Sequence, residues 1–127
     1  MKEKYLTVTG FSYYHGLAPL RPGKLVLCRK EPDNPYDPEA IYCTVPVYGK
    51  LGYVANSVGT VAGGTMSAGR LYDNVCTAFY ARVMFTTQTK VICRVEDAEP
   101  SELKKEILTQ YACEWDDELS DDEEIAF

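Results

Sequence analysis

Residues 31–41 bring together side chains that could bind a polar ligand: Asn34 supplies an amide, Tyr36 an aromatic ring and Asp37 a carboxylate. Prolines at positions 32, 35 and 38 fix the backbone angle φ and push the residue before each of them toward extended geometry. A flexible linker would be richer in Gly and Ser. We therefore predict an ordered loop whose side chains have little freedom left to lose when a ligand binds.

The sequence has no pattern typical of an enzyme or of a metal or cofactor site. His15 is the single histidine, and no Ser or Cys nucleophile stands near it in a catalytic motif. Asp33, Asp37 and Glu39 do not follow the spacing of an EF-hand, and prolines separate them. The glycines of residues 59–64 do not form a phosphate-binding loop. We expect a non-catalytic protein without a cofactor or a metal.

The cysteines indicate a reducing environment. They are odd in number, contain no C-x-x-C pair and follow no zinc-ligand spacing. Because they lie in apolar runs without a preceding signal peptide, we expect reduced, buried thiols in a cytoplasmic protein. No run approaches the roughly 18 apolar residues of a membrane span, so no membrane partner is expected. The five positions are Cys28, Cys43, Cys76, Cys93 and Cys113.

Charge is unevenly distributed along the chain, whose net charge is -6. Residues 1–95 carry 11 Lys and Arg against 6 Asp and Glu, whereas residues 96–127 carry 2 against 13. A polyanion responds to charges within a Debye length of about 10 Å rather than to the whole-chain sum. The basic body therefore permits nucleic-acid binding without proving it, because a modest positive excess is common on other domains.

Short segments rich in β-branched and aromatic residues dominate the chain up to residue 96 and are bounded by Gly, Pro, Asn or Asp. The predicted strands span residues 5–11, 24–29, 40–48, 50–54, 75–85 and 90–96. Six short strands fit a small barrel, in which closure of the sheet removes its edges. We predict a mainly β fold, a six-stranded barrel with one or two short helices.

Two segments have helical features. Residues 56–69 could form a helix that begins at Asn56 or Ser57, but four glycines make it short and broken. Its buried face would consist of Val58, Val61, Ala62 and Met66. A second helix is predicted from Ser101, its expected N-cap, because apolar residues then recur with helical spacing. These are Leu103, Ile107, Leu108 and Tyr111.

The last fifteen residues are strongly acidic, and we separate them as a tail, 113–127, from a barrel domain with a C-terminal helix, 1–112. Such a run repels itself and is expected to stay mobile unless a basic surface binds it. Trp115 and Leu119, with Ile125 and Phe127, give it apolar anchors. Solvation is the ordinary role of an acidic run, and docking on a partner or on the basic body is the alternative.

Several motifs in the first half of the chain, taken in order, resemble the HIRAN domain. They are LTVTGFSYYHG at 6–16, GKLVL at 23–27, EPDNPYD at 31–37 with Ala40 and Ile41, and GKLGYV at 49–54. The resemblance implies an oligonucleotide/oligosaccharide-binding-like (OB-like) β-barrel. Family members are found mostly attached to Swi/Snf-type DNA-dependent ATPases and also alone in bacterial proteins. The best-understood members capture the free 3′ end of single-stranded DNA.

The same resemblance assigns roles to particular residues. In the family, tyrosines at the positions of Tyr13 and Tyr36 sandwich the terminal nucleotide, and an aspartate at the position of Asp37 accepts a hydrogen bond from the terminal hydroxyl. Stacking on a ring is worth roughly 1–3 kcal/mol per base. The alternatives are that either ring covers the barrel and that Asp37 only accepts backbone N–H groups in an Asx-turn. Asn34 is expected either to contact DNA or to lock the loop.

The expected phosphate contacts differ from those of the best-known members. Ser12 and the pair Ala55 and Asn56 stand where those members carry basic residues, and Tyr53, a further candidate contact, stands where a histidine can occur. Losing two cations should weaken binding or move it to other residues. The candidate replacements are Arg29, Lys30, Lys24 and Lys50.

Two hypotheses follow. The first is a non-catalytic module that binds single-stranded DNA with a free 3′ end in DNA repair or replication. A chain of 127 residues is too short to include an ATPase motor, so a partner ATPase, helicase or other DNA-processing protein would be a separate polypeptide. The second is a protein-interaction or regulatory domain that keeps the barrel but lacks DNA affinity, with the acidic tail binding a partner or inhibiting the chain's own groove.

Overall fold

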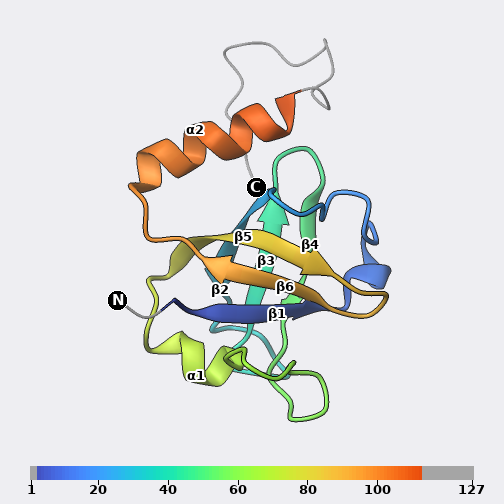
Figure 1. Cartoon of the computed structure of the whole chain (residues 1–127). Helices are drawn as coiled ribbons and strands as arrows, with labels where there is room; N and C mark the ends of the chain where they lie inside the picture. Colours follow the sequence, from blue (N-terminus) through green and yellow to red (C-terminus); the bar gives the residue numbers. More distant parts are fainter. Residues whose placement is uncertain (1–2, 113–127) are drawn as a thin grey trace.

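The computed structural model describes residues 3–112, which form a closed barrel of six strands with two α-helices and one short 3-10 helix (Figure 1). The strands are β1 (Tyr5–Thr9), β2 (Leu25–Lys30), β3 (Ile41–Val45), β4 (Gly49–Val54), β5 (Ala78–Thr86) and β6 (Val91–Val95). The helices are η1 (Phe11–Tyr13), α1 (Ala68–Tyr72) and α2 (Pro100–Gln110). The mainly β class, the barrel and the number of strands predicted from the sequence are confirmed.

The strands follow the order β1-β4-β3-β2-β5-β6 around the barrel, and each pairs antiparallel with both neighbours. Alternate side chains of the strands point into the barrel, where they form one apolar core. Fully burying a side chain of this kind stabilises the fold by about 1.5–3 kcal/mol. Examples with no exposed surface are Leu6, Val26, Ile41 and Leu51.

The chain turns sharply where β1 ends, and the turn places the first candidate tyrosine. The predicted strand 5–11 ends at Thr9, because Gly10 adopts a left-handed conformation with φ 75° that only glycine takes up without strain. Phe11 is buried, whereas the ring of Tyr13 at the end of η1 is 86 % exposed. Tyr13 therefore belongs to a helical turn and not to a strand.

The segment 56–69 differs from the prediction. Residues 57–65 consist mainly of turns and bends, and Met66 forms an isolated parallel bridge with Leu6. Helix α1 begins after Ser67, whose hydroxyl accepts a hydrogen bond from the backbone N–H of Arg70. Asn56 and Ser57 therefore do not cap α1, and Val58 is fully exposed rather than buried. Glycines at 59, 63 and 64 disfavour an earlier start, so the helix forms only where they end.

The C-terminal helix packs on the barrel as its apolar spacing predicts, with Leu103, Ile107 and Tyr111 buried. The predicted N-cap is wrong by two residues: the cap is Glu99, and Ser101 lies within the first turn. Pro100 explains the shift, because its fixed φ suits the first helical position and its missing N–H would have no partner there.

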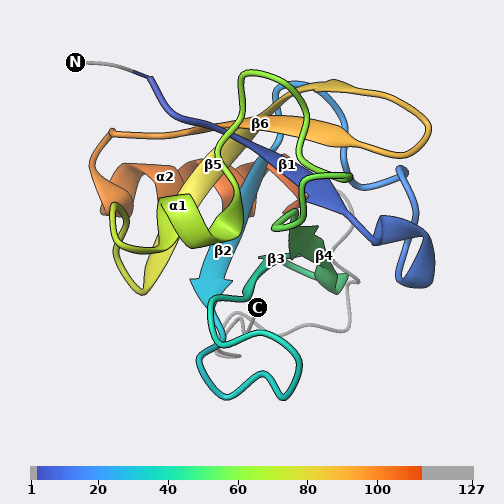
Figure 2. The same ribbon diagram turned by 90° about the horizontal axis from the view of Figure 1, so that it is seen from below.

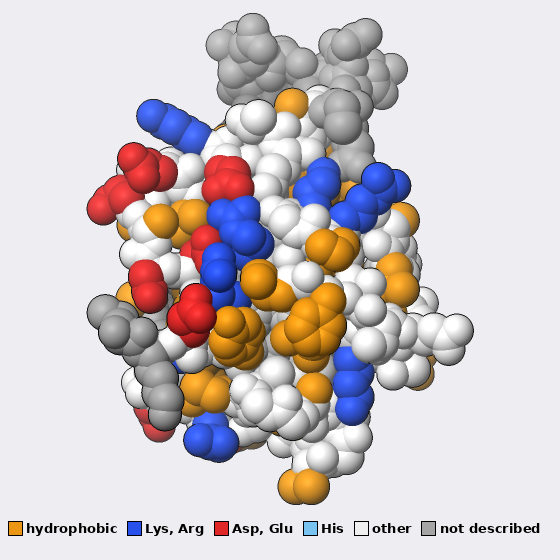
Figure 3. All heavy atoms as spheres, viewed as in Figure 1, with side chains coloured by type: hydrophobic (Ala, Val, Ile, Leu, Met, Phe, Trp, Pro, Cys, Tyr) orange, Lys and Arg blue, Asp and Glu red, His pale blue; other side chains and the backbone are white. Residues whose placement is uncertain are grey.

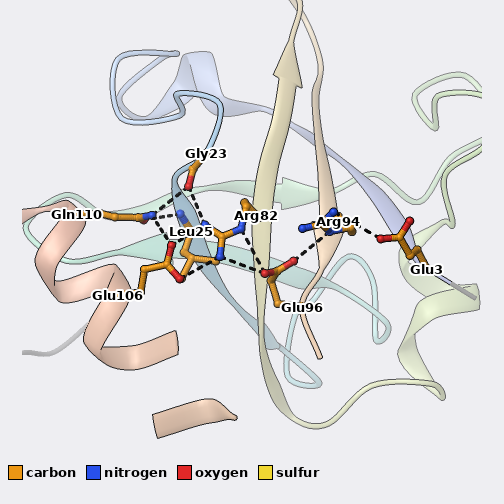
Figure 4. Close-up of polar contacts among 8 residues, drawn as sticks. All are labelled: Glu3, Gly23, Leu25, Arg82, Arg94, Glu96, Glu106 and Gln110. Atoms are coloured by element: carbon orange, nitrogen blue, oxygen red, sulfur yellow. Dashed lines mark hydrogen bonds and ion pairs between the residues drawn. The ribbon is translucent and has the colours of Figure 1, made fainter. Parts of the chain in front are cut away.

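An ion-pair network holds α2 against β5 (Figure 4). The guanidinium of Arg82 donates to both carboxylate oxygens of Glu106, at 2.6 and 2.9 Å, and to Oε1 of Glu96. Arg94 donates to the other oxygen of Glu96 at 3.1 Å. The bond from Arg82 lowers the pKa of Glu106, and Glu106 and Glu96 raise the pKa of Arg82. Both arginines are therefore committed to the fold.

The buried thiols lie inside the barrel. Cys28 and Cys43 face each other across β2 and β3 with their sulfur atoms 3.5 Å apart, and Cys93 is also buried. The contact with Cys43, together with burial, raises the pKa of Cys28, and burial raises that of Cys93. Cys76 is exposed, so the expectation of burial is wrong there, and Cys113 lies outside the described residues.

Within residues 3–112, no helix combines the length and the apolar character needed to cross a bilayer. The predicted acidic tail, 113–127, lies outside the described residues.

Candidate nucleic-acid interface

The loop between β2 and β3 projects beyond the barrel (Figure 2). Its residues form one wall of an open groove of about 850 Å³. The opposite wall comes from the end of β4 and the residues that follow it. We call this hollow the loop groove. It is lined by Thr9, Glu31, Asp33, Asn34, Pro35, Tyr36, Asp37, Ala40, Tyr53, Val54, Ala55, Asn56, Ser57 and Thr60.

Asn34 organises the loop. Its Oδ1 accepts hydrogen bonds from the backbone N–H groups of Tyr36, at 2.8 Å, and Asp37, at 3.0 Å. Its Nδ2 donates to Oε1 of Glu31 at 2.7 Å. One side chain thus fixes the backbone that carries both candidate ligand contacts. Of the two roles expected for Asn34, these contacts favour locking the loop, and a contact to DNA stays a prediction.

Asp37 is held at both of its oxygens. Oδ1 accepts from the backbone N–H of Glu39 at 2.9 Å, which is the Asx-turn contact considered as an alternative. Oδ2 accepts from Nδ2 of Asn56 at 2.8 Å and so joins the loop to the opposite wall of the groove. A carboxylate oxygen accepts more than one hydrogen bond, so the aligned Asp37 keeps the capacity to accept a ligand hydroxyl.

The two candidate stacking rings are almost free of protein contact. The side chain of Tyr36 is 94 % exposed and that of Tyr13 is 86 % exposed, so neither ring covers the barrel. Tyr36 lines the loop groove, whereas Tyr13 lies at the end of η1 and is not among the lining residues. An exposed tyrosine on a stiff loop offers an apolar face at little entropic cost. The structure thus brings Tyr36, Asp37 and Asn34 together and leaves Tyr13 outside.

Tyr53 lies on β4 and is part of a charged cluster at the groove wall. Its hydroxyl donates to Oε1 of Glu31 at 2.8 Å and accepts from Nζ of Lys50 at 2.9 Å. The hydrogen bond from Asn34, supported by Tyr53 and Lys50, lowers the pKa of Glu31, so this carboxylate is ionised at neutral pH. Burial raises the pKa of Tyr53, which keeps its proton. A ligand at Tyr53 therefore meets the ring rather than a free hydroxyl.

The two cations predicted on β2 are not part of the loop groove. Lys30 donates to the backbone carbonyl of Val75 at 2.8 Å, and its ammonium lies 4.4 Å from the centre of the Tyr72 ring. Arg29 has a buried Nε without a hydrogen-bond partner among the described residues. Neither residue lines the loop groove. The structure does not place Arg29 and Lys30 beside Tyr36, and their contact with DNA stays a prediction.

The other two candidate cations are also used within the fold. Lys24 donates to the carbonyl of Gln110 at 2.7 Å, and Lys50 pairs with Glu31 at 3.5 Å in addition to its bond with Tyr53. On the face shown in Figure 3, Lys and Arg side chains in the centre lie against Asp and Glu side chains. The lining of the loop groove contains three acids and no Lys or Arg.

Two groove residues were missed from the sequence as functional elements. Asn56 was considered a helix cap, yet its Nδ2 donates to Asp37 and its Oδ1 accepts from the N–H of Gly69 at 2.7 Å. Glu31 anchors both Asn34 and Tyr53. The sequence signal available was an amide directly after the GKLGYV strand and an acid at the loop entrance. Among the described residues, no three His, Cys, Asp or Glu side chains are grouped to hold a metal ion.

Comparison with known proteins identifies the fold. The solved HIRAN domain of human HLTF is 20 % identical, with a TM-score of 0.54 over 87 % of this chain and 87 % of that chain. A crystal structure of a protein from Lactobacillus plantarum is 24 % identical, with a TM-score of 0.51 over 72 % of this chain and 88 % of that chain. A comparison with curated protein sequences gives no significant match.

The family model of the HIRAN domain matches residues 2–104, which include the whole barrel and the loop groove. This family is known generally for DNA binding, and its domains are generally non-catalytic. With a match over most of its length, the chain belongs to the HIRAN domain family.

Proposed function

We propose that this chain is a non-catalytic module that recognises single-stranded DNA with a free 3′ end, in DNA repair or replication. The observation that carries the proposal is the pairing of an almost fully exposed ring, Tyr36, with an aligned carboxylate, Asp37, on a loop locked by Asn34. Stacking of the terminal base on Tyr36 would contribute roughly 1–3 kcal/mol. The second stacking role, which the resemblance gives to Tyr13, would require this ring to reach the base from outside the loop groove.

The charge of the loop groove supports an end rather than an interior of the strand. Glu31, Asp33 and Asp37 line it, and the ion pair with Lys50 compensates Glu31 alone, so a phosphate inside it would be repelled by the other two carboxylates. A terminal nucleoside offers a hydroxyl that donates to a carboxylate instead. The same groove therefore favours the hydroxyl end and disfavours both an internal position and a 3′-phosphate.

Fluorescence anisotropy with oligonucleotides labelled at the 5′ end tests this function. We expect tighter binding of a 3′-hydroxyl strand than of a 3′-phosphate strand. Tyr36→Ala should lose affinity for both, whereas Asp37→Ala should reduce the difference between them. Phe85→Ala and Asp97→Ala remove an exposed ring and an exposed acid outside the groove and should bind as the unmodified chain does. Equal affinity for the two ends would contradict the proposal.

A second candidate function is a protein-interaction or regulatory domain without DNA affinity. It is favoured by the absence of Lys and Arg from the lining of the loop groove. A chain shortened at Glu114 keeps every described element and distinguishes the cases. Failure of both lengths to bind DNA at low salt would favour this second function, and binding only by the shortened chain would favour inhibition by the acidic segment. A partner ATPase or helicase belongs to the first proposal, as the separate motor that uses the captured end.

A further inference from the structure

A second hollow of about 400 Å³ adjoins the loop groove. It is formed by residues of the segment 56–67 and by Arg70 of α1, and it shares Asn56 and Ser57 with the groove. The surface is therefore continuous from Tyr36 across Asn56 and Ser57 to Arg70 in α1. A strand whose last nucleoside occupies the loop groove has this path available for its preceding nucleotides.

The wall between the two hollows is rigid. Asn56 is bonded on both sides, to Asp37 in the loop groove and to the backbone of Gly69 in α1. A Cβ atom at Gly69 would lie 2.7 Å from Oε1 of Glu39 and 3.2 Å from Oδ1 of Asn56, so α1 sits tightly against the loop. The position of Arg70 relative to the groove is thus fixed by contacts on the adjacent residue.

The backbone of Arg70 is held by hydrogen bonds, whereas its guanidinium group is unpaired among the described residues. Its N–H donates to the hydroxyl of Ser67 and its carbonyl accepts from the amide of Asn74. Its guanidinium has no hydrogen bond or ion pair with any described residue, in contrast to Arg82, which is bound on both sides. Among the residues that line the two hollows, Arg70 is the sole Lys or Arg.

We propose that the second hollow holds an internal phosphodiester of the bound strand and that Arg70 is its cationic contact. Arginine presents a planar fork of donors that matches two phosphate oxygens. The exposed side chain of Val58 and the glycine-rich backbone at 63–64 leave room for the sugar beside it. The two hollows then have opposite charge. The acidic loop groove repels phosphate, and the cation Arg70 lies on the other side of Asn56, beside the preceding nucleotides.

This inference rests on the proposed function, and the salt dependence of binding tests it separately. The probe is a 5′-labelled oligothymidylate of about ten nucleotides with a 3′-hydroxyl, a length within the usual site size of an OB-like barrel. One phosphate contact to a single strand contributes about 0.7 to the slope of log K against log salt. Arg70→Ala should reduce the slope by about this amount and weaken binding about fivefold at low salt.

Three variants serve as comparisons. Arg70→Lys should keep most of the slope, because the positive charge remains. Lys104→Ala removes an equal charge from the exposed face of α2 and should leave both slope and affinity unchanged. Tyr36→Ala should weaken binding without changing the slope, because stacking is not ionic. Circular dichroism melting should show the same Tm for Arg70→Ala and the unmodified chain.

The two possible failures are distinguishable. If the unmodified chain prefers the 3′-hydroxyl strand and Arg70→Ala keeps its full salt slope, the inference about Arg70 is wrong and the proposed function stands. If the unmodified chain binds no oligonucleotide, the proposed function is wrong and the inference with it. A slope reduced equally by Lys104→Ala would also overturn the inference, because the effect would then report net charge rather than a contact.

Discussion

Replacing Asn34 with Asp tests whether one amide holds the loop that carries Tyr36 and Asp37. The substitution keeps the shape and the acceptor oxygen, but it replaces the Nδ2 donor with an oxygen directed at Oε1 of Glu31, 2.7 Å away. A hydrogen bond to a charged group is worth about 1.5–3 kcal/mol. That bond is lost, and a like charge takes its place.

The repulsion adds a smaller amount. Two unit charges about 4 Å apart repel by about 4 kcal/mol at an effective dielectric constant near 20. The Glu31 side chain is 26 % exposed and the ammonium of Lys50 is 3.5 Å away, so solvent and this cation reduce the repulsion to about 1 kcal/mol. We therefore expect Asn34→Asp to lower the free energy of unfolding by about 2–4 kcal/mol at neutral pH.

The pH dependence of this loss has a definite sign. In the variant, the introduced carboxylate and that of Glu31 would share a proton, so the folded-state pKa of the pair is raised above its unfolded value. The destabilisation is then present at neutral pH and is relieved as the pH falls through that raised pKa. Urea unfolding followed by circular dichroism, at about pH 7 and about pH 4.5, measures it.

A double-mutant cycle with Glu31→Gln isolates the interaction between the two side chains. In the Glu31→Gln background, Asn34→Asp should cost less than about 1 kcal/mol, because no like charge faces the new carboxylate. An equal cost in both backgrounds, or a cost that does not change with pH, would refute the assignment of Asn34 as the residue that locks the loop through Glu31. In that case the prolines alone would account for its order.

Three further predictions concern stability and are measured by chemical unfolding. Gly52→Ala should cost about 1–3 kcal/mol, because its Cβ would lie 2.7 Å from the backbone oxygen of Thr9; an unchanged stability would show that β1 yields. Val47→Gly should stabilise by about 1 kcal/mol, since Val47 has φ 75° in the turn between β3 and β4. The pKa values of Glu31 and Glu106 are lowered in the folded state, so stability present above about pH 4.5 should be lost as the pH falls through those lower values, and Glu106→Gln should flatten this profile.

The strands were predictable from the sequence because each is a local pattern. Residues 24–29 and 50–54, for example, differ from β2 and β4 by one residue at each shifted end. Other ends were less well placed, because the predicted strands 40–48 and 75–85 correspond to β3 (Ile41–Val45) and β5 (Ala78–Thr86). The barrel order, in contrast, follows from pairings between distant strands, and the resemblance of several motifs to one family supplied what local patterns lacked.

The candidate site was predictable only in part, for the same reason. The local bonds of Asn34 follow from an amide placed two residues before Tyr36 in a proline-rich loop. The bond from Asn56 to Asp37 joins residues nineteen positions apart, and nothing in the spacing distinguishes it from a helix cap. Tyr13 is a candidate by resemblance alone, and the left-handed turn at Gly10 that sets its direction could not be predicted from local pattern.

The number of Lys and Arg residues in the sequence overstates the positive charge available to a ligand, because several of these side chains are bound within the fold. Lys24 and Lys30 each donate to a backbone carbonyl while the ammonium lies over a ring, at 4.3 Å from Tyr111 and 4.4 Å from Tyr72. A lysine in such a position stabilises the fold through its charge and its aliphatic stem, and it is less available to a phosphate.

The excess of Lys and Arg over Asp and Glu in residues 1–95 therefore does not measure the electrostatic potential at the ligand site. If the basic body attracted DNA as a whole, the loop groove would hardly need to exclude phosphate, because affinity would come from charge along the entire strand. Under the proposed function, with Arg82 and Arg94 committed to Glu96, affinity would come mainly from stacking, and selectivity from the acids around Asp37. Under the proposed function, such a module would bind an end weakly but discriminate it well, and a single free cation such as Arg70 would then have a disproportionate effect on its salt dependence.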